Sequence, residues 1–370
     1  MRIVVTGADG FIGRNLRWRL REMGHADVVT ITRTTPPDGW AAALRGAEFV
    51  FHLAGVNRPP DPAGYDEGNA GVTDLLCKTL KLLGSRAPVA YASSTQAELD
   101  NPYGRSKRAA EDRLLAHARE VGGPVYVFRL SNVFGKWARP NYNSAVATFC
   151  HRIARGEEIV LHDPASALRL VYVDDVVAAF ASMLGGDEHE TGFHVAGPVH
   201  HSTVGEVASV IREFAASRES LMTPRVGTGL VRALYATYVS YLPPEAFAYD
   251  VPCHADPRGV FIEMLKTPDC GQFSCFTALP GVTRGGHYHH TKTEKFLVIA
   301  GTAHFGFRHI ESGETHELVV RGGSGRIVET IPGWTHDITN TGEGELIVML
   351  WANEVFDRQR PDTVTMKVRE

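Results

Sequence analysis

The sequence predicts two successive folds, an α/β doubly wound parallel sheet followed by an all-β jelly-roll barrel. Over residues 1 to about 200, short apolar runs alternate with amphipathic stretches, as in strands joined by crossover helices. Beyond residue 243, glycines and strand-like runs crowd together instead. A glycine-rich turn directly after the first apolar run is the third observation behind this prediction.

The expected elements follow from these patterns in chain order. Buried strands are expected at Arg2–Thr6, Asp27–Thr32, Phe49–Leu53, Val89–Ala92 and Val125–Leu130, with helices at Asn15–Met23, Thr73–Leu83 and Ser106–Val121. The pattern from Gly205 to Tyr241 is helical, and the prolines at 243 and 244 end it. We therefore expect one domain at 1–243 and a second at 244–370 that folds by itself. Barrel strands are expected at Phe273–Leu279, Lys295–Ile299, His304–His309, Arg326–Ile331 and Leu346–Trp351.

The composition favours a soluble globular protein of the cytoplasm. The 370 residues are 44% hydrophobic and 22% charged, which is typical of globular domains, and the net charge of −4 suggests no nucleic-acid partner. No stretch reaches the roughly 20 apolar residues that span a bilayer, so no membrane association is expected. The five cysteines form no CxxC pair, which favours free thiols in a reducing compartment.

A glycine-rich turn, TGADGFIG (6–13), ends the first predicted strand and opens the first predicted helix. Gly7 and Gly10 allow the backbone to approach a pyrophosphate at the helix N-terminus, and Gly13 allows the helix to pack on the sheet. This context favours a dinucleotide site over a plain tight turn. The cofactor contacts expected here are Gly7, Gly10, Phe11, Ile12 and Gly13.

The end of the second predicted strand indicates which dinucleotide is bound. Sites that prefer NAD usually place there an acid that bonds the ribose 2′-hydroxyl. Here the strand ends in Ile31-Thr32-Arg33, and Arg14 follows the glycine turn. Two guanidinium groups suit a 2′-phosphate, which a carboxylate would repel. We therefore expect NADP(H), bound by Arg14 and Arg33; the alternative is that both are solvated surface arginines.

A Tyr-x-x-x-Lys motif places Tyr103 and Lys107 on one face of a helix. The ammonium group favours the phenolate and lowers the pKa of the tyrosine, which can then pass a proton to a carbonyl oxygen. Just upstream, a predicted strand ends in three hydroxyl residues, and we expect Ser94 to bond the same oxygen. Ser93 or Thr95 could take its place, because the register of three adjacent hydroxyl residues is not fixed by the sequence.

These motifs make residues 1 to about 240 similar to the extended short-chain dehydrogenase/reductases of nucleotide sugars, which have a Rossmann-type fold. The stretches that carry the resemblance are TGADGFIG (6–13), HLAG (52–55), Asn69, YGRSK (103–107), NVFG (132–135) and YVDD (172–175). The resemblance implies Tyr103 as catalyst, Lys107 as activator and Ser94 as third member. It also implies cofactor contacts from Leu53, Ala54, Tyr103 and Lys107, and a substrate contact from Asn132.

Two features depart from this family. Only eight residues separate Ser94 from Tyr103, fewer than is usual. The sugar dehydratases of the family carry an acidic residue directly after the catalytic hydroxyl, whereas the sequence here reads Thr95-Gln96-Ala97. We therefore expect reduction, or reversible oxidation and reduction, and no dehydration.

A histidine cluster in the second domain predicts a metal site. Strand alternation turns His287 and His289 to one side, and Glu294 and His336 can close around the same point. Three imidazoles and a carboxylate suit one divalent metal such as Zn, Ni, Fe or Mn, and we expect Zn. The pattern GxxxxxHxHxxxxExxxxxxG followed by PGxxHxxxN resembles both halves of the cupin signature. His290 is ambiguous, because it could replace a neighbouring ligand or serve as a catalytic base.

The stretch from Asp256 to Glu263 opens the second domain. It resembles the opening segment of cupin-type deoxysugar epimerases, and this implies that Arg258 contacts the nucleotide pyrophosphate. A plain turn and strand is the alternative.

The order of the two domains is similar to bifunctional UDP-sugar enzymes of capsule and O-antigen biosynthesis, on the route to UDP-N-acetyl-L-fucosamine. The stretches involved are HLAGVNRP (52–59), FGKW (134–137), PNYNS and ATFC (140–150), SYLP (240–243), HHTKTEKFLV (289–298), FRH (307–309) and WANEVFD (351–357). The resemblance implies C3 epimerisation of a UDP-2-acetamido-2,6-dideoxy-4-hexulose, then NADPH reduction at C4 to an L-talose-type sugar. Arg169 and Asp174 would shape the sugar site, although Asp174 could simply cap a helix. A homodimer is expected.

Both reactions act around one carbonyl, because a 4-keto group acidifies the proton at C3 and accepts hydride at C4. Two other functions remain open. One is a nucleotide-sugar 4-epimerase or plain reductase whose cupin is structural; a 4-epimerase would retain tightly bound NAD. The other is a binding protein that senses a sugar or redox state, against which the intact Tyr103 and Lys107 pair argues.

Overall fold

The computed structural model spans the whole chain and describes residues 1–185, 189–256, 259–262, 265, 267, 271–354 and 359–369. By its internal contacts the chain divides into two compact units. The first unit comprises Met1–Phe134 and Leu168–Ser202, and the second comprises Gly135–Ala167 and Thr203–Glu370.

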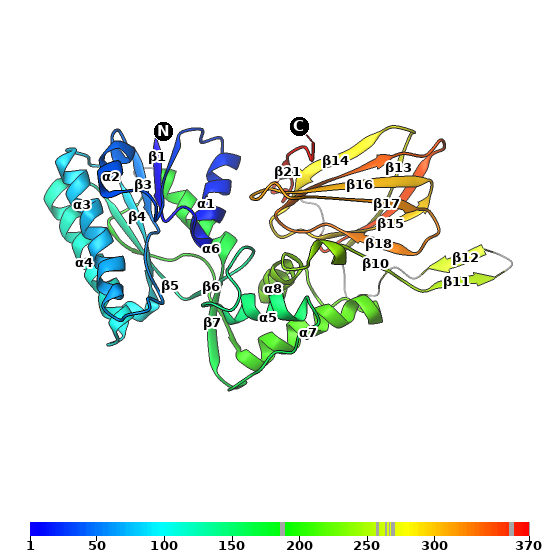
Figure 1. The fold of residues 1–370 in the computed structure, drawn as a ribbon, viewed down its shortest axis with the longest axis horizontal. Coiled ribbons are helices and arrows are strands. Elements are labelled where there is room, and N and C mark those ends of the chain that lie inside the picture. The colour runs from blue at the N-terminus through cyan, green and yellow to red at the C-terminus, as the bar shows by residue number, and fades with distance from the viewer. Residues whose placement is uncertain are drawn as a thin grey trace. The chain divides into compact units, whose positions relative to one another are not determined.

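The first unit is built on a six-stranded parallel sheet (Figure 1). In spatial order its strands are β2 (Val28–Ile31), β1 (Ile3–Thr6), β3 (Phe49–His52), β4 (Val89–Ser94), β5 (Val125–Leu130) and β8 (Gly192–His194). The order reverses at β1, as in a doubly wound sheet, so the segments that follow β1, β3 and β4 meet at one edge.

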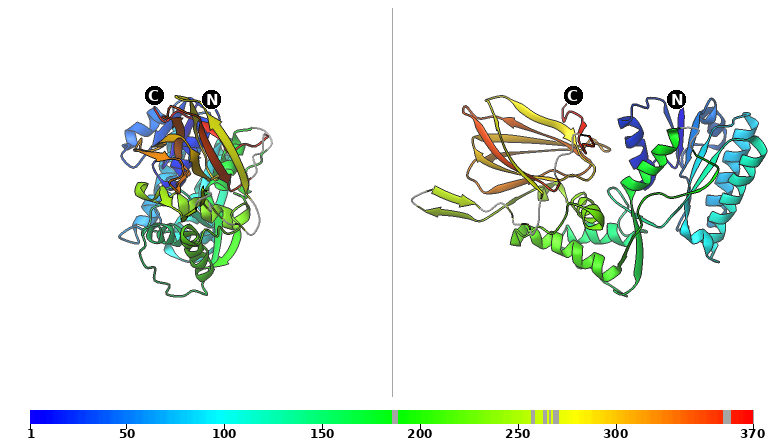
Figure 2. Two further views of the ribbon diagram at one scale, coloured as in Figure 1. Left: turned by 90° about the vertical axis from the view of Figure 1, so that its right-hand side faces the viewer. Right: turned by 180° about the vertical axis from the view of Figure 1, so that it is seen from behind.

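Helices cover both faces of this sheet, as Figures 1 and 2 show. One face carries α2 (Pro37–Leu44), α3 (Val72–Leu82) and α4 (Pro102–Val121), and the other carries α1 (Phe11–Glu22) and α6 (Val173–Ser182). On the first face, Trp40, Leu80 and Leu114 pack against strand residues such as Val50 and Val127 in one buried apolar cluster. The predicted α/β doubly wound parallel sheet is confirmed.

Two helices begin earlier than the apolar periodicity predicts. The helix expected from Ser106 starts at Pro102, because Asn101 caps it: its side-chain oxygen accepts the Gly104 N–H at 2.7 Å. The helix expected from Asn15 starts at Phe11, immediately after the glycine turn. Both starting points bring functional candidates into first helical turns.

The chain also forms a separate, small three-stranded sheet in the order β6-β7-β9. Its strands are β6 (Asn132–Phe134), β7 (Ala167–Tyr172) and β9 (His200–Thr203). β6 and β7 run parallel, with Asn132 opposite Leu170. The end of β7 leads directly into α6. The substrate-binding candidates Asn132, Arg169 and Asp174 therefore lie on neighbouring elements.

The second unit contains two antiparallel five-stranded sheets, which confirms the predicted all-β fold after the parallel sheet. One has the order β10 (Ala248–Asp250), β18 (Arg326–Glu329), β15 (Glu294–Ala300), β20 (Leu346–Ala352), β13 (Gln272–Ala278). The other has the order β17 (Thr315–Arg321), β16 (Thr302–His309), β19 (Trp334–Asn340), β14 (Thr283–Tyr288), β21 (Val364–Thr365). Their inner faces meet in an aromatic core, where the rings of Phe296 and Phe305 lie 5.8 Å apart.

The remaining elements of the second unit are helical or form a short ribbon. The helices are α5 (Ala145–Ile153), α7 (Val204–Ser220) and α8 (Gly229–Val239), and the ribbon pairs β11 (Cys253–Asp256) with β12 (Gly259–Ile262). By contacts, all three helices belong with the antiparallel sheets. The predicted boundary at residue 243 concerns independent folding and stays a prediction.

A buried charged network joins α7 to the antiparallel sheets across residue 243. The Glu329 carboxylate on β18 pairs with both Arg218 on α7 and Lys295 on β15. The Lys295 ammonium also donates to the Tyr249 hydroxyl at 3.1 Å. The side chains of Lys295 and Glu329 are only 2% and 4% exposed, so each charge depends on its partners.

We expect a fragment of residues 244–370 to be less stable than a fragment of residues 203–370. Cutting at 243 removes Arg218 and leaves Glu329 with one of its two partners, and removing one member of a buried ion pair costs about 3–5 kcal/mol. Urea unfolding followed by circular dichroism measures the difference. Equal unfolding midpoints for the two fragments would support the boundary at 243 and contradict this expectation.

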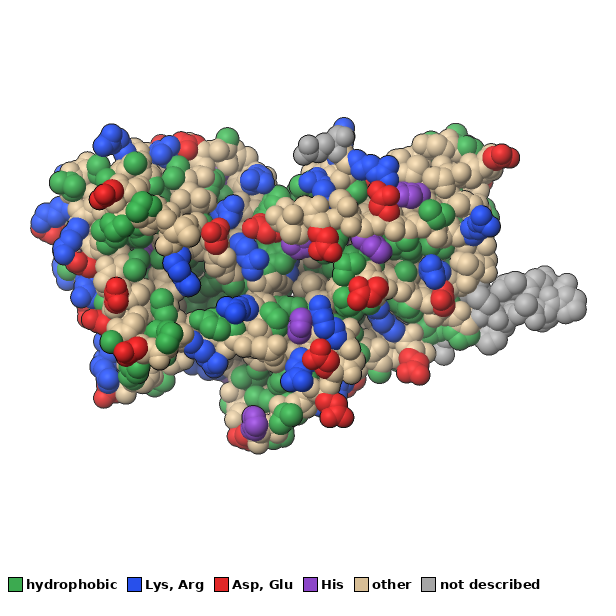
Figure 3. Space-filling model, in the orientation of Figure 1, with side chains coloured by type: hydrophobic (Ala, Val, Ile, Leu, Met, Phe, Trp, Pro, Cys, Tyr) green, Lys and Arg blue, Asp and Glu red, His purple; other side chains and the backbone are tan. Residues whose placement is uncertain are grey.

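The surface carries charges of both signs. On the face drawn in Figure 3, acidic and basic side chains are interspersed over both units. Within the described part of the chain, no helix combines the length and the apolar character needed to cross a bilayer.

Candidate functional site

The glycine turn after β1 has a backbone that only glycine can adopt. Gly7 has a φ of +64°, and a Cβ there would lie 2.7 Å from the backbone nitrogen of Ala54. The Gly10 N–H donates to the Gly7 carbonyl at 2.9 Å, and a side chain at Gly13 would clash with that carbonyl. The turn therefore packs directly on the segment that follows β3. Because its glycines have no side chains, only backbone groups line the other side of the turn at these positions.

The N-terminus of α1 suits a pyrophosphate. Gly10 is the N-cap and has no side chain to bond the first-turn N–H groups of Phe11 and Ile12, and the first turn contains no acidic residue. Leu53 and Ala54 border the turn, and Ala54 N–H donates to the Thr6 hydroxyl at 3.1 Å. The residues present thus fit a dinucleotide, in the arrangement predicted from the sequence.

A buried histidine supports this turn from below. The two ring nitrogens of His52 lie 2.8 Å from the Thr6 hydroxyl and 2.9 Å from the Thr73 hydroxyl. Burial, together with the charge of Lys107, lowers the pKa of His52 to about 3, so the ring is neutral. His52 therefore fixes Thr6, and through it the Ala54 amide, without bringing charge to the cofactor site.

The residues that follow β2 are compatible with a 2′-phosphate. Arg33 lies two residues beyond β2 and is exposed, while Arg14 lies half-buried in α1. Thr32 and Thr34, on either side of Arg33, are hydrogen-bonded to each other through their hydroxyls at 2.9 Å. No acidic side chain stands at the end of this strand.

Replacing Arg33 by Ala is expected to weaken NADPH binding about tenfold or more while leaving NADH binding nearly unchanged. Losing one charge-assisted hydrogen bond costs roughly 1.5–3 kcal/mol of binding free energy. NADH lacks the 2′-phosphate, so its binding does not depend on this contact. Dissociation constants from cofactor fluorescence titrations measure both effects, with Arg45→Ala as an exposed arginine control. Equal weakening for both cofactors would show that Arg33 does not contact the 2′-phosphate.

The predicted catalytic trio is brought together at the end of β4. Tyr103 lies in the first turn of α4 and is hydrogen-bonded to Ser94, the last residue of β4. Lys107 follows one turn later, and its ammonium donates to the Ala92 carbonyl at 2.7 Å. The same ammonium lies 4.4 Å from the centre of the Tyr91 ring, which stabilises its charge.

The geometry distinguishes between the adjacent serines. Ser94 has its hydroxyl beside Tyr103, whereas Ser93 is buried and bonded to Glu111. Glu111 in turn forms an ion pair of 2.6 Å with Arg129 on β5. Ser93 is thus part of a structural network behind the strand, and Ser94 stands as the hydroxyl for the candidate site.

Burial changes the acidity of both remaining members of the trio. It raises the pKa of Tyr103, with the Ser94 hydrogen bond acting in the opposite direction, so the net shift is opposite to that predicted from the Tyr-Lys spacing. It lowers the pKa of Lys107 to about 7, against the influence of Glu111. The Tyr103 hydroxyl is therefore protonated in the ligand-free chain, while the pKa of Lys107 lies close to neutral pH.

Three of the four substrate-binding candidates, Asn132, Arg169 and Asp174, lie on neighbouring elements. Asn132 is exposed at the start of β6, and Arg169 is exposed on β7 beside Leu170, the partner of Asn132. Asp174 lies in the first turn of α6, whose N-cap is Tyr172. Arg258 lies outside the described residues.

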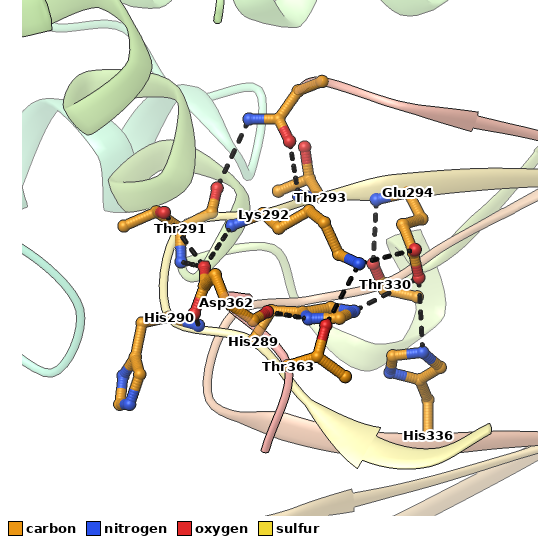
Figure 4. A network of polar contacts seen from close by, with 11 residues as sticks. His289, His290, Thr291, Lys292, Thr293, Glu294, Thr330, His336, Asp362 and Thr363 are labelled. Carbon is orange, nitrogen blue, oxygen red and sulfur yellow. Dashed lines mark hydrogen bonds and ion pairs between the residues drawn. The ribbon is translucent and has the colours of Figure 1, made fainter. Parts of the chain in front are cut away.

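The four predicted metal ligands converge in the second unit, and Figure 4 shows three of them, His289, Glu294 and His336. One ligand atom from each residue lies within 4.8 Å of the other three; the residues are His287, His289, Glu294 and His336. The Oε2 atom of Glu294 lies 3.2 Å from His289 Nε2 and 3.5 Å from His336 Nε2. β14, β15 and β19 carry three of the ligands, and His289 follows β14 directly.

The hydrogen bonds of this cluster are compatible with a bound cation. His289 Nδ1 bonds the backbone carbonyl of Asp362, which can only accept, so in neutral His289 the lone pair on Nε2 faces the Glu294 carboxylate. Two acceptors face each other at 3.2 Å, and a positive charge between them would remove the repulsion. The three-histidine, one-carboxylate donor set fits a divalent metal such as Zn²⁺.

The acidities of His287 and Glu294 agree with metal ligands that need no proton removed. Burial, reinforced by His336 and His289, lowers the pKa of His287 to about 3. Although burial acts to raise the pKa of Glu294, the neighbouring rings of His289 and His336 hold it well below its usual range. A neutral imidazole and an ionised carboxylate are the forms that coordinate metal.

His290 is not one of the converging groups. Figure 4 shows its ring directed away from Glu294 and His336, while its backbone N–H donates to the Asp362 carboxylate at 2.9 Å. Two residues that the sequence did not single out join the cluster. They are Asp362, which binds the turn after β14, and Lys292, whose ammonium lies 3.2 Å from Glu294 Oε1.

The comparisons with known proteins identify the family. A sequence profile of the NAD dependent epimerase/dehydratase family matches residues 3–197, more than half of the chain. The chain belongs to this family. A second profile, the polysaccharide biosynthesis C-terminal domain, matches residues 254–364. Membership of the NAD dependent family makes a nicotinamide dinucleotide the expected class of cofactor.

A full-length relative is the UDP-2-acetamido-2,6-beta-L-arabino-hexul-4-ose reductase of Pseudomonas aeruginosa, 54% identical over 370 residues, with both chains covered completely. Among solved structures, the capsular polysaccharide assembling protein CapF from Staphylococcus aureus is 39% identical, with a TM-score of 0.68 and 99% and 100% of the chains covered. A UDP-glucose 4-epimerase from Thermotoga maritima matches 58% of this chain and 83% of its own, with 25% identity and a TM-score of 0.53. The resemblance predicted from the sequence is thus confirmed for the family.

Proposed function

We propose that this family member is a bifunctional UDP-sugar enzyme. It would epimerise C3 of a UDP-2-acetamido-2,6-dideoxy-4-hexulose at the metal cluster and reduce C4 with NADPH to give an L-talose-type product. The observation that supports this most is the identity of 54% over the full length with a UDP-2-acetamido-2,6-beta-L-arabino-hexul-4-ose reductase. The reductase step rests on the joined Ser94 and Tyr103, and the epimerase step on the four converging ligands.

In the reduction, Ser94 and Tyr103 would hold the C4 carbonyl oxygen from one side. Bound NADPH supplies the hydride. As negative charge develops on the oxygen, Tyr103 donates its proton, and the Lys107 ammonium, fixed by the Ala92 carbonyl, stabilises the phenolate that remains. Burial of the tyrosine keeps it protonated until this moment. The proposal does not include elimination of water, because none of the residues that follow Ser94, namely Thr95, Gln96 and Ala97, is acidic.

In the epimerisation, His287, His289, Glu294 and His336 would hold one divalent metal, with Zn²⁺ as our choice. Such a metal polarises a carbonyl and so acidifies the neighbouring C–H bond. We retain His290 as the proposed base. Because its ring is directed away from the ligands in Figure 4, the sugar would have to approach from the side of the turn after β14.

The remaining assignments complete the proposal. Asn132, Arg169 and Asp174 would contact the sugar nucleotide, as would Arg258. Arg33 and Arg14 would select NADPH. A second candidate, a nucleotide-sugar 4-epimerase with a structural metal site, is favoured by the UDP-glucose 4-epimerase fold of the first unit and predicts tightly retained NAD.

Proton NMR of the reaction in D₂O tests the proposal. The substrate is a UDP-4-keto sugar, incubated with and without NADPH. We expect deuterium at C3 in both cases, and NADPH oxidation with a reduced C4 in the first case only. Reduction without deuterium at C3 would contradict the epimerase function. Exchange without NADPH oxidation would contradict the reductase function, and release of NAD from denatured protein would favour the 4-epimerase.

A further inference from the structure

Asp362 binds the turn that joins two strands of the metal cluster. The turn connects the end of β14 to the start of β15 and contains the residues from His289 to Lys292. The Asp362 carboxylate accepts three of its backbone N–H groups, from His290 at 2.9 Å, Thr291 at 2.6 Å and Lys292 at 2.7 Å. It also accepts the Thr291 hydroxyl at 2.9 Å. One side chain, 70 or more positions away in the sequence, thus satisfies consecutive amides that the strand ladders leave unpaired.

The same residue also fixes a ligand directly. The backbone carbonyl of Asp362 accepts a hydrogen bond from His289 Nδ1, which leaves Nε2 as the unprotonated nitrogen in the neutral ring. Nε2 is the atom that faces Glu294 Oε2. Because carboxylate and carbonyl belong to one residue, the bonds to the turn determine where the carbonyl lies.

The turn sets the orientation of the carboxylate ligand as well. The amide of Lys292 is held by Asp362, and its ammonium lies 3.2 Å from Glu294 Oε1 and 3.3 Å from the Thr363 hydroxyl. The other oxygen, Oε2, faces the two histidines. Figure 4 shows this sequence of contacts from Asp362 through the turn to Glu294.

We propose that Asp362 is a positioning residue of the metal site. It fixes the tautomer of His289 and, through Lys292, leaves a single oxygen of Glu294 directed at the histidines. This inference rests on the proposed function, because the cluster must bind metal for the positioning to matter. Groups that hold metal ligands from outside typically change metal affinity 10–100-fold when removed.

The first test uses the wild-type chain and needs no variant. The protein is labelled with ¹⁵N in its histidines and stripped of metal, and the protonated nitrogen of His289 is read by NMR, with His289→Gln used to assign the signal. We expect the proton on Nδ1. A proton on Nε2 in the metal-free wild type would overturn the proposal.

The second test measures Zn²⁺ affinity by competition with a chelating dye. Asp362→Asn keeps the shape but removes the charge and one acceptor oxygen, and Asp362→Ala removes the contacts altogether. We expect Zn²⁺ binding to weaken about 10–100-fold in Asp362→Ala, less in Asp362→Asn, and not in Asp163→Asn. The last variant is a matched control, since Asp163 also accepts a backbone N–H, from Ala165 at 3.1 Å, but lies outside the cluster.

The outcomes separate this inference from the proposed function. If the wild type binds no Zn²⁺, the metal site itself is wrong. If the wild type binds Zn²⁺ and both Asp362 variants, folded by circular dichroism, bind it equally well, only the positioning role is wrong. Should Asp362→Ala fail to fold, Asp362→Asn and the tautomer of the wild type decide.

Discussion

Replacing Tyr103 by Phe is expected to abolish NADPH oxidation by the chain while leaving exchange of the C3 proton intact. The substitution removes the proton donor that is hydrogen-bonded to Ser94 and changes nothing in the second unit's cluster. A positioned general acid typically contributes 10²–10⁴-fold to a rate, so reduction should fall by about that factor. NADPH absorbance and deuterium incorporation at C3 measure the two reactions separately.

Tyr65→Phe is the matched control for this prediction. Its ring lies 5.7 Å from that of Tyr103, but its hydroxyl donates to the Asn57 carbonyl at 3.4 Å. Reduction should therefore persist in that variant. If Tyr103→Phe lost C3 exchange as completely as reduction, the reductase site would be responsible for both reactions, and the cluster would have no role in epimerisation.

Replacing His336 by Ala should remove bound metal and suppress C3 exchange, while NADPH binding is retained. His336 supplies one of four converging ligands, and the remaining three would leave the metal with an incomplete set. Metal affinity should fall by more than the 10–100-fold that is typical for groups outside the coordination sphere. Elemental analysis of the purified protein and the D₂O exchange assay test the two parts.

Two other histidines serve as controls. His304 lies on the adjacent strand β16, and its ring is 3.2 Å from the Glu317 carboxylate. The His304→Ala variant should therefore keep a full complement of metal. His290→Ala should also retain metal, because its ring is directed away from the cluster. Full metal occupancy in His336→Ala, or metal loss in His290→Ala, would show that a different set of residues binds the ion.

The parts of the structure that follow local rules could be predicted from the sequence. The glycine turn and the strand expected at Val125–Leu130 appear where expected, because backbone clashes and apolar burial act within a few residues. The pair of Tyr103 and Lys107 follows from helical spacing alone. The convergence of His336 with His287 was expected from the spacing of the histidines and the resemblance to the cupin signature, and the structure places the two residues opposite each other on paired strands.

Other features depend on single residues that are distant in the sequence and belong to no pattern. Asp362 lies 73 positions after His289, and an isolated aspartate carries no sign of what it will bind. The hydrogen bond from Ser93 to Glu111 could not be predicted, because it depends on which way a side chain points at the end of a strand. Lys292 stands two residues before Glu294 but lies in the turn before β15, where no strand alternation indicates which side its side chain takes.

The path of the chain limits how these folds can be recombined. The second unit is assembled from two separate segments, so the chain passes between the units three times. A crossover of two genes at residue 243 would combine an α7 from one parent with a β18 from the other, and the pair of Arg218 and Glu329 would have to match. A crossover at residue 202 would keep that pair but separate α5 from its neighbours α7 and α8. Exchange of the antiparallel sheets between distant relatives therefore requires co-adapted helices to be transferred with them.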